Sequence, residues 1–213
     1  MNILKSVKPL IILFARKPVP GQVKTRLGLD PIAAVRLHDE FVRATLSTLA
    51  ALNAEIEIST DEPCDAWNGH VTTVQCPGDL GERMYGAISR ALESRHPAVM
   101  ILGSDSPDLP PRHLASLLNS TADIALGPTE DGGYYAIACR RADARMFAGV
   151  RWSSEHALAD TVRACNACGL TVEVGPKWFD VDRPEDLDRL RTNPKWRAIE
   201  AIHHNLSTMI DKK

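Results

Sequence analysis

Basic side chains gather in a short segment near the start of the chain, directly after an apolar run. This segment, FARKPVPGQVKTRLG at residues 14–28, contains no acidic residue and carries Arg16, Lys17, Lys24 and Arg26. Cations held together in this way can neutralise phosphate oxygens, and an arginine can bind two oxygens at once. A solvated basic loop is the alternative interpretation, but the position directly after a predicted strand favours phosphate binding.

The basic segment differs from the common glycine-rich phosphate-binding loops. The pattern GxxxxGK[ST] would need glycine at Pro18 and Val23, and the pattern GxGxxG is absent. Pro18, Pro20 and Gly21 instead predict a stiff and then flexible turn. Such a turn would direct Lys24 and the cations near it back over the edge of a sheet.

A candidate metal ligand follows a second apolar run, in the stretch VMILGSDSPDLPP at residues 99–111. The run predicts a buried strand, and Asp105 comes directly after its end. A carboxylate in this position can hold a divalent cation, which takes oxygen ligands and bridges phosphates. The alternative is that Asp105 or Asp108 only caps a turn or a helix.

A glycine pair lies between two strand-like runs in GPTEDGGYYAIA, residues 127–138. Gly132 and Gly133 have no side chain, so backbone there could approach a ligand closely. A hairpin turn at the same place is an equally good interpretation, and both can hold together.

Acidic residues alternate in WFDVDRPEDLDRL, residues 178–190. Asp180 and Asp182 follow the period of an extended segment, so they point to the opposite side from Val181. The pair Asp182 and Glu185 also fits the pattern that begins a helix, which makes capping the favoured role for Asp182 when it is considered alone.

Cys165 and Cys168 form a CxxC pair, which could be redox-active or half of a metal site. No second closely spaced pair is present, since Cys64 and Cys76 lie far apart. The pair falls near the end of a predicted helix that Gly169 would end, so we expect small helix residues without a chemical role.

Composition limits the classes of partner. The chain has 213 residues, a net charge of -2 and 44% hydrophobic residues, which is ordinary for a globular protein and gives no overall attraction to nucleic acid or to an anionic membrane. No apolar run approaches the length of a membrane span. The odd number of cysteines, with no secretion signal, predicts a cytoplasmic protein.

Strand-like and helix-like patterns alternate along the chain and would position these residues. Strands are expected at 9–15, 54–60, 71–76, 97–103, 122–127, 133–139 and 170–175, and helices at 31–52, 80–95, 110–119, 154–168, 184–191 and 195–210. This alternation predicts one α/β domain over residues 1–213 with a mostly parallel sheet. Ligands bind beyond the carboxyl ends of such strands. The 195–210 helix would pack on the core or on a second subunit, so a homo-oligomer is possible.

Taken together, the motifs resemble the GT-A-like nucleotide-diphospho-sugar transferases, a glycosyltransferase-like family akin to phospholactate guanylyltransferase. The similarity rests on FARKPVPGQVKTRL at 14–27, GDLGERM at 78–84, GSDSPDLP at 103–110, DGGYY at 131–135 and DVDRPEDL at 180–187. The resemblance implies a GT-A-like three-layer α/β sandwich. It also implies a transferase that acts on a nucleotide or nucleotide-sugar and a small-molecule acceptor.

The resemblance implies a site for Mg²⁺ or Mn²⁺ held by Asp105, with Asp182 or Asp180 completing it. Arg16, Lys17, Lys24 and Arg26 would bind the phosphates together with Gly132 and Gly133. A base for the acceptor hydroxyl would be Asp131 or Glu155.

Sugar transfer from a nucleotide-diphospho-sugar is the favoured reaction. Nucleotidyl transfer, with release of pyrophosphate, is the alternative, although the chain lacks the LAGG loop of related guanylyltransferases. A nucleotide-binding protein without catalysis is a third possibility, which metal-dependent turnover would exclude.

Overall fold

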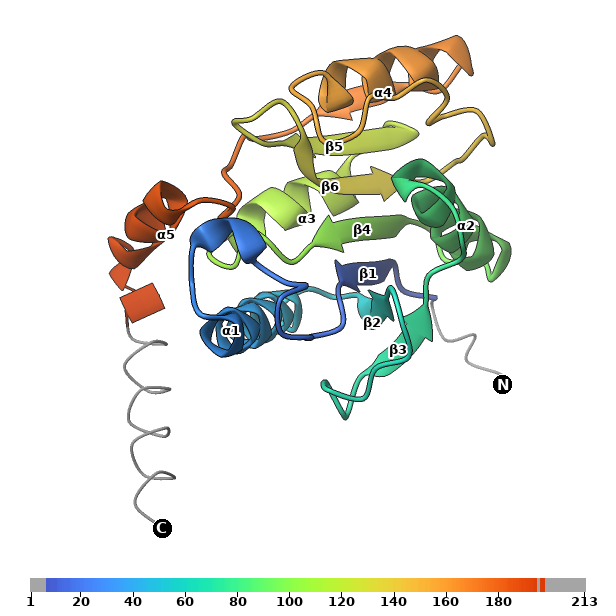
Figure 1. The fold of residues 1–213 in the computed structure, drawn as a ribbon. Helices are drawn as coiled ribbons and strands as arrows, with labels where there is room; N and C mark the ends of the chain where they lie inside the picture. Colours follow the sequence, from blue (N-terminus) through green and yellow to red (C-terminus); the bar gives the residue numbers. More distant parts are fainter. Residues whose placement is uncertain (1–6, 195, 198–213) are drawn as a thin grey trace.

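Seven strands form one sheet in the order β3-β2-β1-β4-β6-β5-β7 (Figure 1). The structure is a computed structural model that describes residues 7–194, 196 and 197. The strands are β1 Leu10–Ala15, β2 Glu55–Thr60, β3 Val71–Val74, β4 Val99–Gly103, β5 Ile124–Pro128, β6 Tyr134–Cys139 and β7 Val172–Val174. Only β6 runs antiparallel to its neighbours, β4 and β5, so the predicted mostly parallel sheet is confirmed.

Five helices and one 3-10 turn alternate with the strands among the described residues. They are η1 Thr25–Leu27, α1 Pro31–Leu49, α2 Leu80–Glu93, α3 Pro111–Asn119, α4 Ala157–Ala167 and α5 Pro184–Arg191. Each predicted strand is present, and so is each predicted helix up to residue 191, with ends that differ by a few residues. The prediction of a helix at 195–210 lies outside the described residues, apart from Trp196 and Arg197.

Local capping explains where the first two helices begin. The Asp30 side chain accepts hydrogen bonds from the backbone N–H groups of Ile32 and Ala33, and Pro31 occupies the first helical position. Asp79 and Glu82 form the reciprocal capping box that their spacing predicts. The loops after β1 and β3 therefore end at fixed points.

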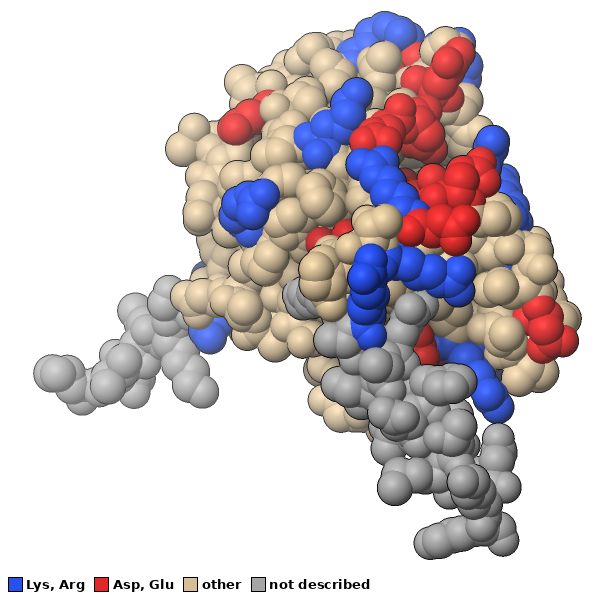
Figure 2. Space-filling model, turned by 90° about the vertical axis from the view of Figure 1, so that its left-hand side faces the viewer, with Lys and Arg blue, Asp and Glu red and all other residues tan. Residues whose placement is uncertain are grey.

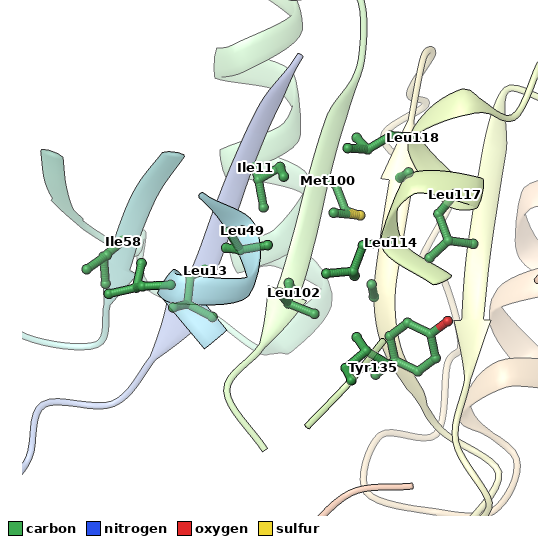
Figure 3. Packing of buried hydrophobic residues seen from close by; sticks show 14 of the residues in the cluster. Ile11, Leu13, Leu49, Ile58, Met100, Leu102, Leu114, Leu117, Leu118 and Tyr135 are labelled. Atoms are coloured by element: carbon green, nitrogen blue, oxygen red, sulfur yellow. The ribbon is translucent and has the colours of Figure 1, made fainter. Parts of the chain in front are cut away.

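Alternate residues of the central strands pack on opposite faces of the sheet. Met100 and Leu102 of β4 belong to one buried cluster, which also contains residues of the neighbouring strands and of α1 and α3 (Figure 3). Val99 and Ile101 belong to a second cluster, which contains buried residues of α2 and α4. Helices thus cover both faces, which gives the predicted three-layer sandwich.

A third buried cluster joins the end of the described chain to α1. Trp196 is 1% exposed and packs edge to face on Phe41, with 5.2 Å between ring centroids. Phe179, Val181 and Leu187 complete this contact. Trp196 therefore packs in the core, as its apolar character predicts. Among the described residues, no helix has both the length and the apolarity needed to cross a membrane.

Candidate active site

A cavity of about 770 Å³ lies beyond the carboxyl ends of β1, β2, β3 and β4. The arrowheads of β1 and β4 point toward the side of the molecule where α5 lies (Figure 1). Seen from that side, acidic and basic side chains lie next to one another (Figure 2). Of the residues predicted from the sequence, the cavity is lined by Arg16, Lys24, Arg26, Asp105 and Asp182. This is where ligands bind in sheets of this type.

Lys24 lies at the centre of the polar contacts of the cavity. Its Nζ donates to Oδ1 of Asp105 at 2.6 Å and to the carbonyl oxygen of Val181 at 2.9 Å. It also lies 4.4 Å from the ring centroid of Phe41, and its side chain is only 4% exposed. The backbone of Lys24 has φ 50°, a left-handed conformation that a non-glycine residue adopts at a cost.

Asp105 follows β4, and both its backbone carbonyl and its carboxylate accept hydrogen bonds. Its backbone carbonyl accepts from the N–H of Val181 at 2.8 Å, and its carboxylate accepts from Lys24, while about half of its side chain stays exposed, 49%. Burial, the largest single effect, raises the pKa of Asp105, but the charge and hydrogen bond of Lys24 together with the charges of His38 and Arg16 lower it by more, so the net shift is downward. Asp105 is therefore a stable anion with one oxygen available to a ligand.

Asp180 and Asp182 lie close enough to Asp105 and to Asp131 for the charges of these carboxylates to repel one another. Burial raises the pKa of Asp180 to about 7, and the charges of Asp105, Asp131 and Asp182 add to this shift. Burial also raises the pKa of Asp182, with Asp105 contributing. Arg26 offsets part of this excess, because its Nη1 lies 3.3 Å from Oδ2 of Asp182. The prediction left open whether Asp180 or Asp182 joins Asp105, and the structure brings both into the cluster.

Asp105, Asp131, Asp180 and Asp182 form a four-aspartate cluster, whose chemistry suits a divalent cation. It is built of oxygen donors, which Mg²⁺ and Mn²⁺ prefer, and it carries more negative charge than Lys24 and Arg26 neutralise. In the described part of the chain, no three His, Cys, Asp or Glu side chains stand close enough together to enclose a metal ion unaided. Such a cation would therefore share its coordination with a phosphate group, as Mg²⁺ usually does.

Two predicted site residues have other partners in the structure. Lys17 donates its backbone N–H to Asp61 at 2.8 Å and pairs with Glu62 at 3.5 Å. Gly132 packs against the chain before α4, where an added Cβ would lie 2.2 Å from the carbonyl oxygen of Glu155. Neither residue lines the cavity.

Asp131 and Gly133 belong to a tight turn between β5 and β6. Oδ1 of Asp131 accepts from the Thr129 hydroxyl at 2.5 Å and from the Gly133 N–H at 3.0 Å. The second carboxylate oxygen makes neither bond. Glu155, the other candidate base, has a side chain that is 79% exposed and 3.7 Å from His156.

The two capping interpretations of the acidic residues are wrong. Helix α5 begins at Pro184, and it is Asp186 that accepts from the backbone N–H groups of Arg183 at 2.9 Å and Asp182 at 3.2 Å. Asp108 does not cap α3 either. Its carboxylate accepts from the indole of Trp178 and the amide of Asn193, both at 3.1 Å. The carboxylates of Asp182 and Asp108 instead contact residues that are far away in the sequence, which local spacing does not reveal.

Sequence reasoning missed several residues of the cavity wall. Arg83 of α2 donates Nη1 to Gln75 at 3.1 Å and Nε to the backbone carbonyl of Asp79 at 3.3 Å. His38 of α1 is buried and bonds through Nε2 to the carbonyl of Arg16 at 2.9 Å; burial lowers its pKa. Trp152 also lines the cavity. The signal for Arg83 was present, since it lies in the motif GDLGERM.

The CxxC pair lies in the helical setting that was predicted. Cys165 is buried within α4 and Cys168 is the C-cap of that helix. All five cysteines are free thiols. In the described residues, no cysteine takes part in a group of potential metal ligands.

A family profile described as "Uncharacterized protein conserved in bacteria (DUF2064)" matches residues 37–154. The chain belongs to the DUF2064 family. The crystal structure of a "putative nucleotide-diphospho-sugar transferase" from Desulfovibrio desulfuricans G20 is 34% identical, with a TM-score of 0.84 over 97% of this chain and 98% of that one. The resemblance inferred from the motifs is thereby confirmed.

More distant structures share the fold of this DUF2064 protein. CMP:2-keto-3-deoxy-manno-octonic acid synthetase complexed with CTP is 14% identical, with a TM-score of 0.58 over 87% of this chain and 97% of that one. Rv0371C of Mycobacterium tuberculosis H37Rv, in complex with manganese, is 16% identical, with a TM-score of 0.53 over 86% and 97%. No curated protein sequence gives a significant match. The named relatives include a transferase and a nucleotide-bound synthetase.

Proposed function

We propose that this DUF2064 protein is a metal-dependent transferase that acts on a nucleotide-activated substrate, with a nucleotide-diphospho-sugar as the donor. The observation that carries the proposal is the contact of Lys24 with Asp105 at 2.6 Å in a cavity that Arg16 and Arg26 also line. Cations and carboxylates placed together in this way suit a diphosphate bound with a divalent cation. The 34% identical relative, described as a "putative nucleotide-diphospho-sugar transferase", supports the same class.

Asp105 and Asp182 would hold Mg²⁺ or Mn²⁺, with Asp180 beside them. When bound, the cation supplies charge neutralisation for the diphosphate leaving group. Lys24, Arg16 and Arg26 bind the remaining phosphate oxygens and stabilise the charge that develops there. Arg83, held by Gln75, adds a cation on the α2 side of the cavity.

Asp131 is our choice for the base that accepts the proton of the acceptor hydroxyl. Its Oδ1 is used within the turn, which leaves Oδ2 for the hydroxyl. Its charge acts on Asp180 and Asp182, so it lies near the metal ligands. Glu155 is less suited, because its side chain is largely exposed.

Nucleotidyl transfer is the second candidate, favoured by one observation. The fold is shared with a synthetase whose structure contains CTP. The same cations and metal would then stabilise pyrophosphate as the leaving group. Release of pyrophosphate from a nucleoside triphosphate would identify this reaction, whereas release of a nucleoside diphosphate from a nucleotide-sugar identifies sugar transfer.

The test compares the parent protein with Asp105→Asn and Asp108→Asn. Nucleoside diphosphate affinity is measured by calorimetry with and without Mn²⁺, and turnover is measured with a panel of nucleotide-sugars and nucleoside triphosphates. We expect Asp105→Asn to abolish the enhancement of binding by Mn²⁺ and to reduce turnover severely. Asp108→Asn should keep the enhancement, because Asp108 contacts Trp178 and Asn193 instead. Full enhancement in Asp105→Asn would remove Asp105 as a ligand, and binding without any turnover would favour a non-catalytic nucleotide-binding protein.

A further inference from the structure

Trp152 forms an aromatic wall of the cavity. It is partly exposed, and its neighbour Ser153 also lines the cavity. Two of the other tryptophans, Trp67 and Trp196, are buried at 3% and 1% exposure. The remaining one, Trp178, does not line the cavity. Trp152 is thus the indole placed to touch a bound molecule.

The segment that carries Trp152 is fixed by an ion pair between the exposed Arg151 and the buried carboxylate of Asp160. Asp160 of α4 has a side chain that is 2% exposed and accepts from Nε and Nη2 of Arg151 at 2.7 and 3.0 Å. Its carboxylate also accepts from the backbone N–H of Arg151 at 3.2 Å and lies 2.9 Å from the guanidinium of Arg163. Charged bonds of this kind, made to a carboxylate removed from water, hold the backbone at Arg151 in one place.

The indole itself is packed from three sides. Its ring centroid lies 5.8 Å from that of Phe147 and 6.4 Å from that of Tyr134. At Gly81 an added Cβ would lie 3.0 Å from Cζ2 of Trp152, so the glycine leaves room for the ring. Ser153 has φ 56°, a left-handed conformation that costs free energy and is found where the surrounding structure imposes it.

The order of the strands places this wall relative to the phosphate site. Asp61 and Gln75 follow β2 and β3, the basic loop follows β1, and Asp105 follows β4. Trp152 packs on Tyr134, the first residue of β6, and because β6 runs antiparallel to its neighbour β4, this residue lies at the same edge of the sheet as Asp105. A diphosphate bound between the basic loop and Asp105 therefore has polar side chains at the β2 and β3 end and Trp152 toward the β6 end.

We infer that Trp152 is the stacking platform for the sugar ring of the donor, an inference that rests on the proposed function. In a nucleotide-diphospho-sugar, the diphosphate separates the nucleoside from the sugar. The polar carboxylate and amide at the β2 and β3 end suit the edge of a base. The partly exposed indole of Trp152, which lines the cavity, suits the apolar face of a pyranose, with Ser153 beside it for a sugar hydroxyl.

The test uses Trp152→Ala and Trp152→Phe, with Trp178→Phe as a matched control outside the cavity. Calorimetry with Mn²⁺ gives the affinity of each protein for UDP and UDP-glucose and for GDP and GDP-mannose. The measured quantity is the ratio of the nucleotide-sugar dissociation constant to that of its nucleoside diphosphate. We expect this ratio to rise about threefold to tenfold in Trp152→Ala, less in Trp152→Phe and not at all in the control.

Three results would overturn the inference in distinguishable ways. Unchanged affinities of Trp152→Ala for all four ligands would show that neither the sugar nor the base rests on Trp152. An equal loss of affinity for UDP and UDP-glucose, or for GDP and GDP-mannose, would show that Trp152 stacks on the base instead. If the parent protein binds no nucleotide of the panel, the proposed function fails, and the inference fails with it. Thermal unfolding of each variant checks that the fold is retained.

Discussion

At the scale of the residue, Lys24 and Arg26 are two cations of one loop with different surroundings. Lys24 is almost fully buried, with a side chain 4% exposed, and bonds to Asp105 and Val181. Arg26 is 73% exposed and pairs with Asp182. Both face the cavity, so both can bind phosphate, but only Lys24 also holds the folded loop together.

Replacing Lys24 or Arg26 by alanine should separate the effect on nucleotide binding from the effect on the free energy of unfolding. Either variant should lose about tenfold to a hundredfold in nucleoside diphosphate affinity, because each removes a charged hydrogen bond worth roughly 1.5–3 kcal/mol. Lys24→Ala should also lower the free energy of unfolding by about 1–3 kcal/mol, whereas Arg26→Ala should change it by less than about 0.5 kcal/mol. Calorimetry and urea denaturation measure the two effects. Unchanged affinity in both variants would show that the loop does not bind phosphate.

Asp180 gives a pH dependence whose sign follows from its raised pKa. The folded protein binds this proton more tightly than the unfolded chain, with a pKa of about 7 against an ordinary 3.8. The contribution of Asp180 to the free energy of unfolding is therefore fully present below about pH 4 and is lost as the pH rises through about 7. Burial and the neighbouring carboxylates are the cause.

The variant Asp180→Asn should remove this loss, because asparagine stays neutral. In metal-free protein with chelator, we expect its stability relative to the parent to increase between about pH 5 and about pH 8. His38 acts in the opposite direction, since burial lowers its pKa, but it contributes equally to both proteins and cancels in the difference. Urea denaturation at several pH values measures this difference. A difference that does not vary with pH would mean that Asp180 titrates in the ordinary range.

At the scale of the element, the β5–β6 turn packs closely against the start of α4 at Gly132. Gly132 has φ 91°, and its carbonyl accepts from the N–H of Leu158 at 3.0 Å. Glu130 of the same turn forms a bidentate pair with Arg189 of α5, at 2.7 and 3.0 Å. The turn that carries Asp131 is therefore attached to two helices.

Gly132→Ala should destabilise the protein far more than Gly149→Ala does. Both glycines have a left-handed backbone, with φ 91° and 73°, so both variants pay about 1–2 kcal/mol of strain. An added Cβ at Gly149 meets nothing within 4 Å, whereas at Gly132 it lies 2.2 Å from a backbone oxygen. We expect a loss of about 3 kcal/mol or more at Gly132 by urea denaturation. Equal losses at the two positions would show that the close approach does not matter.

At the scale of the whole molecule, the sheet is held by packing on both faces, and no disulfide contributes. Helices α1 and α3 cover one face, and α2 and α4 cover the other. The five cysteines are free, with Cys139 and Cys165 fully buried. Burial raises the pKa of Cys165 to about 11, so its thiolate, the reactive form, is scarce.

The double variant Cys165→Ser and Cys168→Ser should leave metal content and turnover unchanged. We expect a modest loss of stability, about 1–2 kcal/mol, because a hydroxyl replaces a buried thiol at Cys165. The parent protein should also unfold at the same temperature with and without a reducing agent. Metal analysis and thermal unfolding test this. Stoichiometric zinc that is lost in the double variant would contradict it.

The sequence by itself determined the elements, because their signals are local. Apolar runs marked the strands, and Asp30 with Pro31 and Asp79 with Glu82 marked the starts of α1 and α2. Lys24 and Asp105 could be found in the same way, since each follows a strand whose carboxyl end lies at the ligand-binding edge of the sheet.

The tertiary structure decided which of the candidates lie together. Lys24 meets Asp105 across 81 positions of the chain, while Lys17, only seven positions away from Lys24, turns to Glu62. Neighbours in a loop point in different directions, and hydropathy carries no information about where each charge finds its partner. The same holds for Trp152, whose place in the cavity depends on Asp160 and on the room left at Gly81. Such positions follow from long-range packing, which local spacing does not encode.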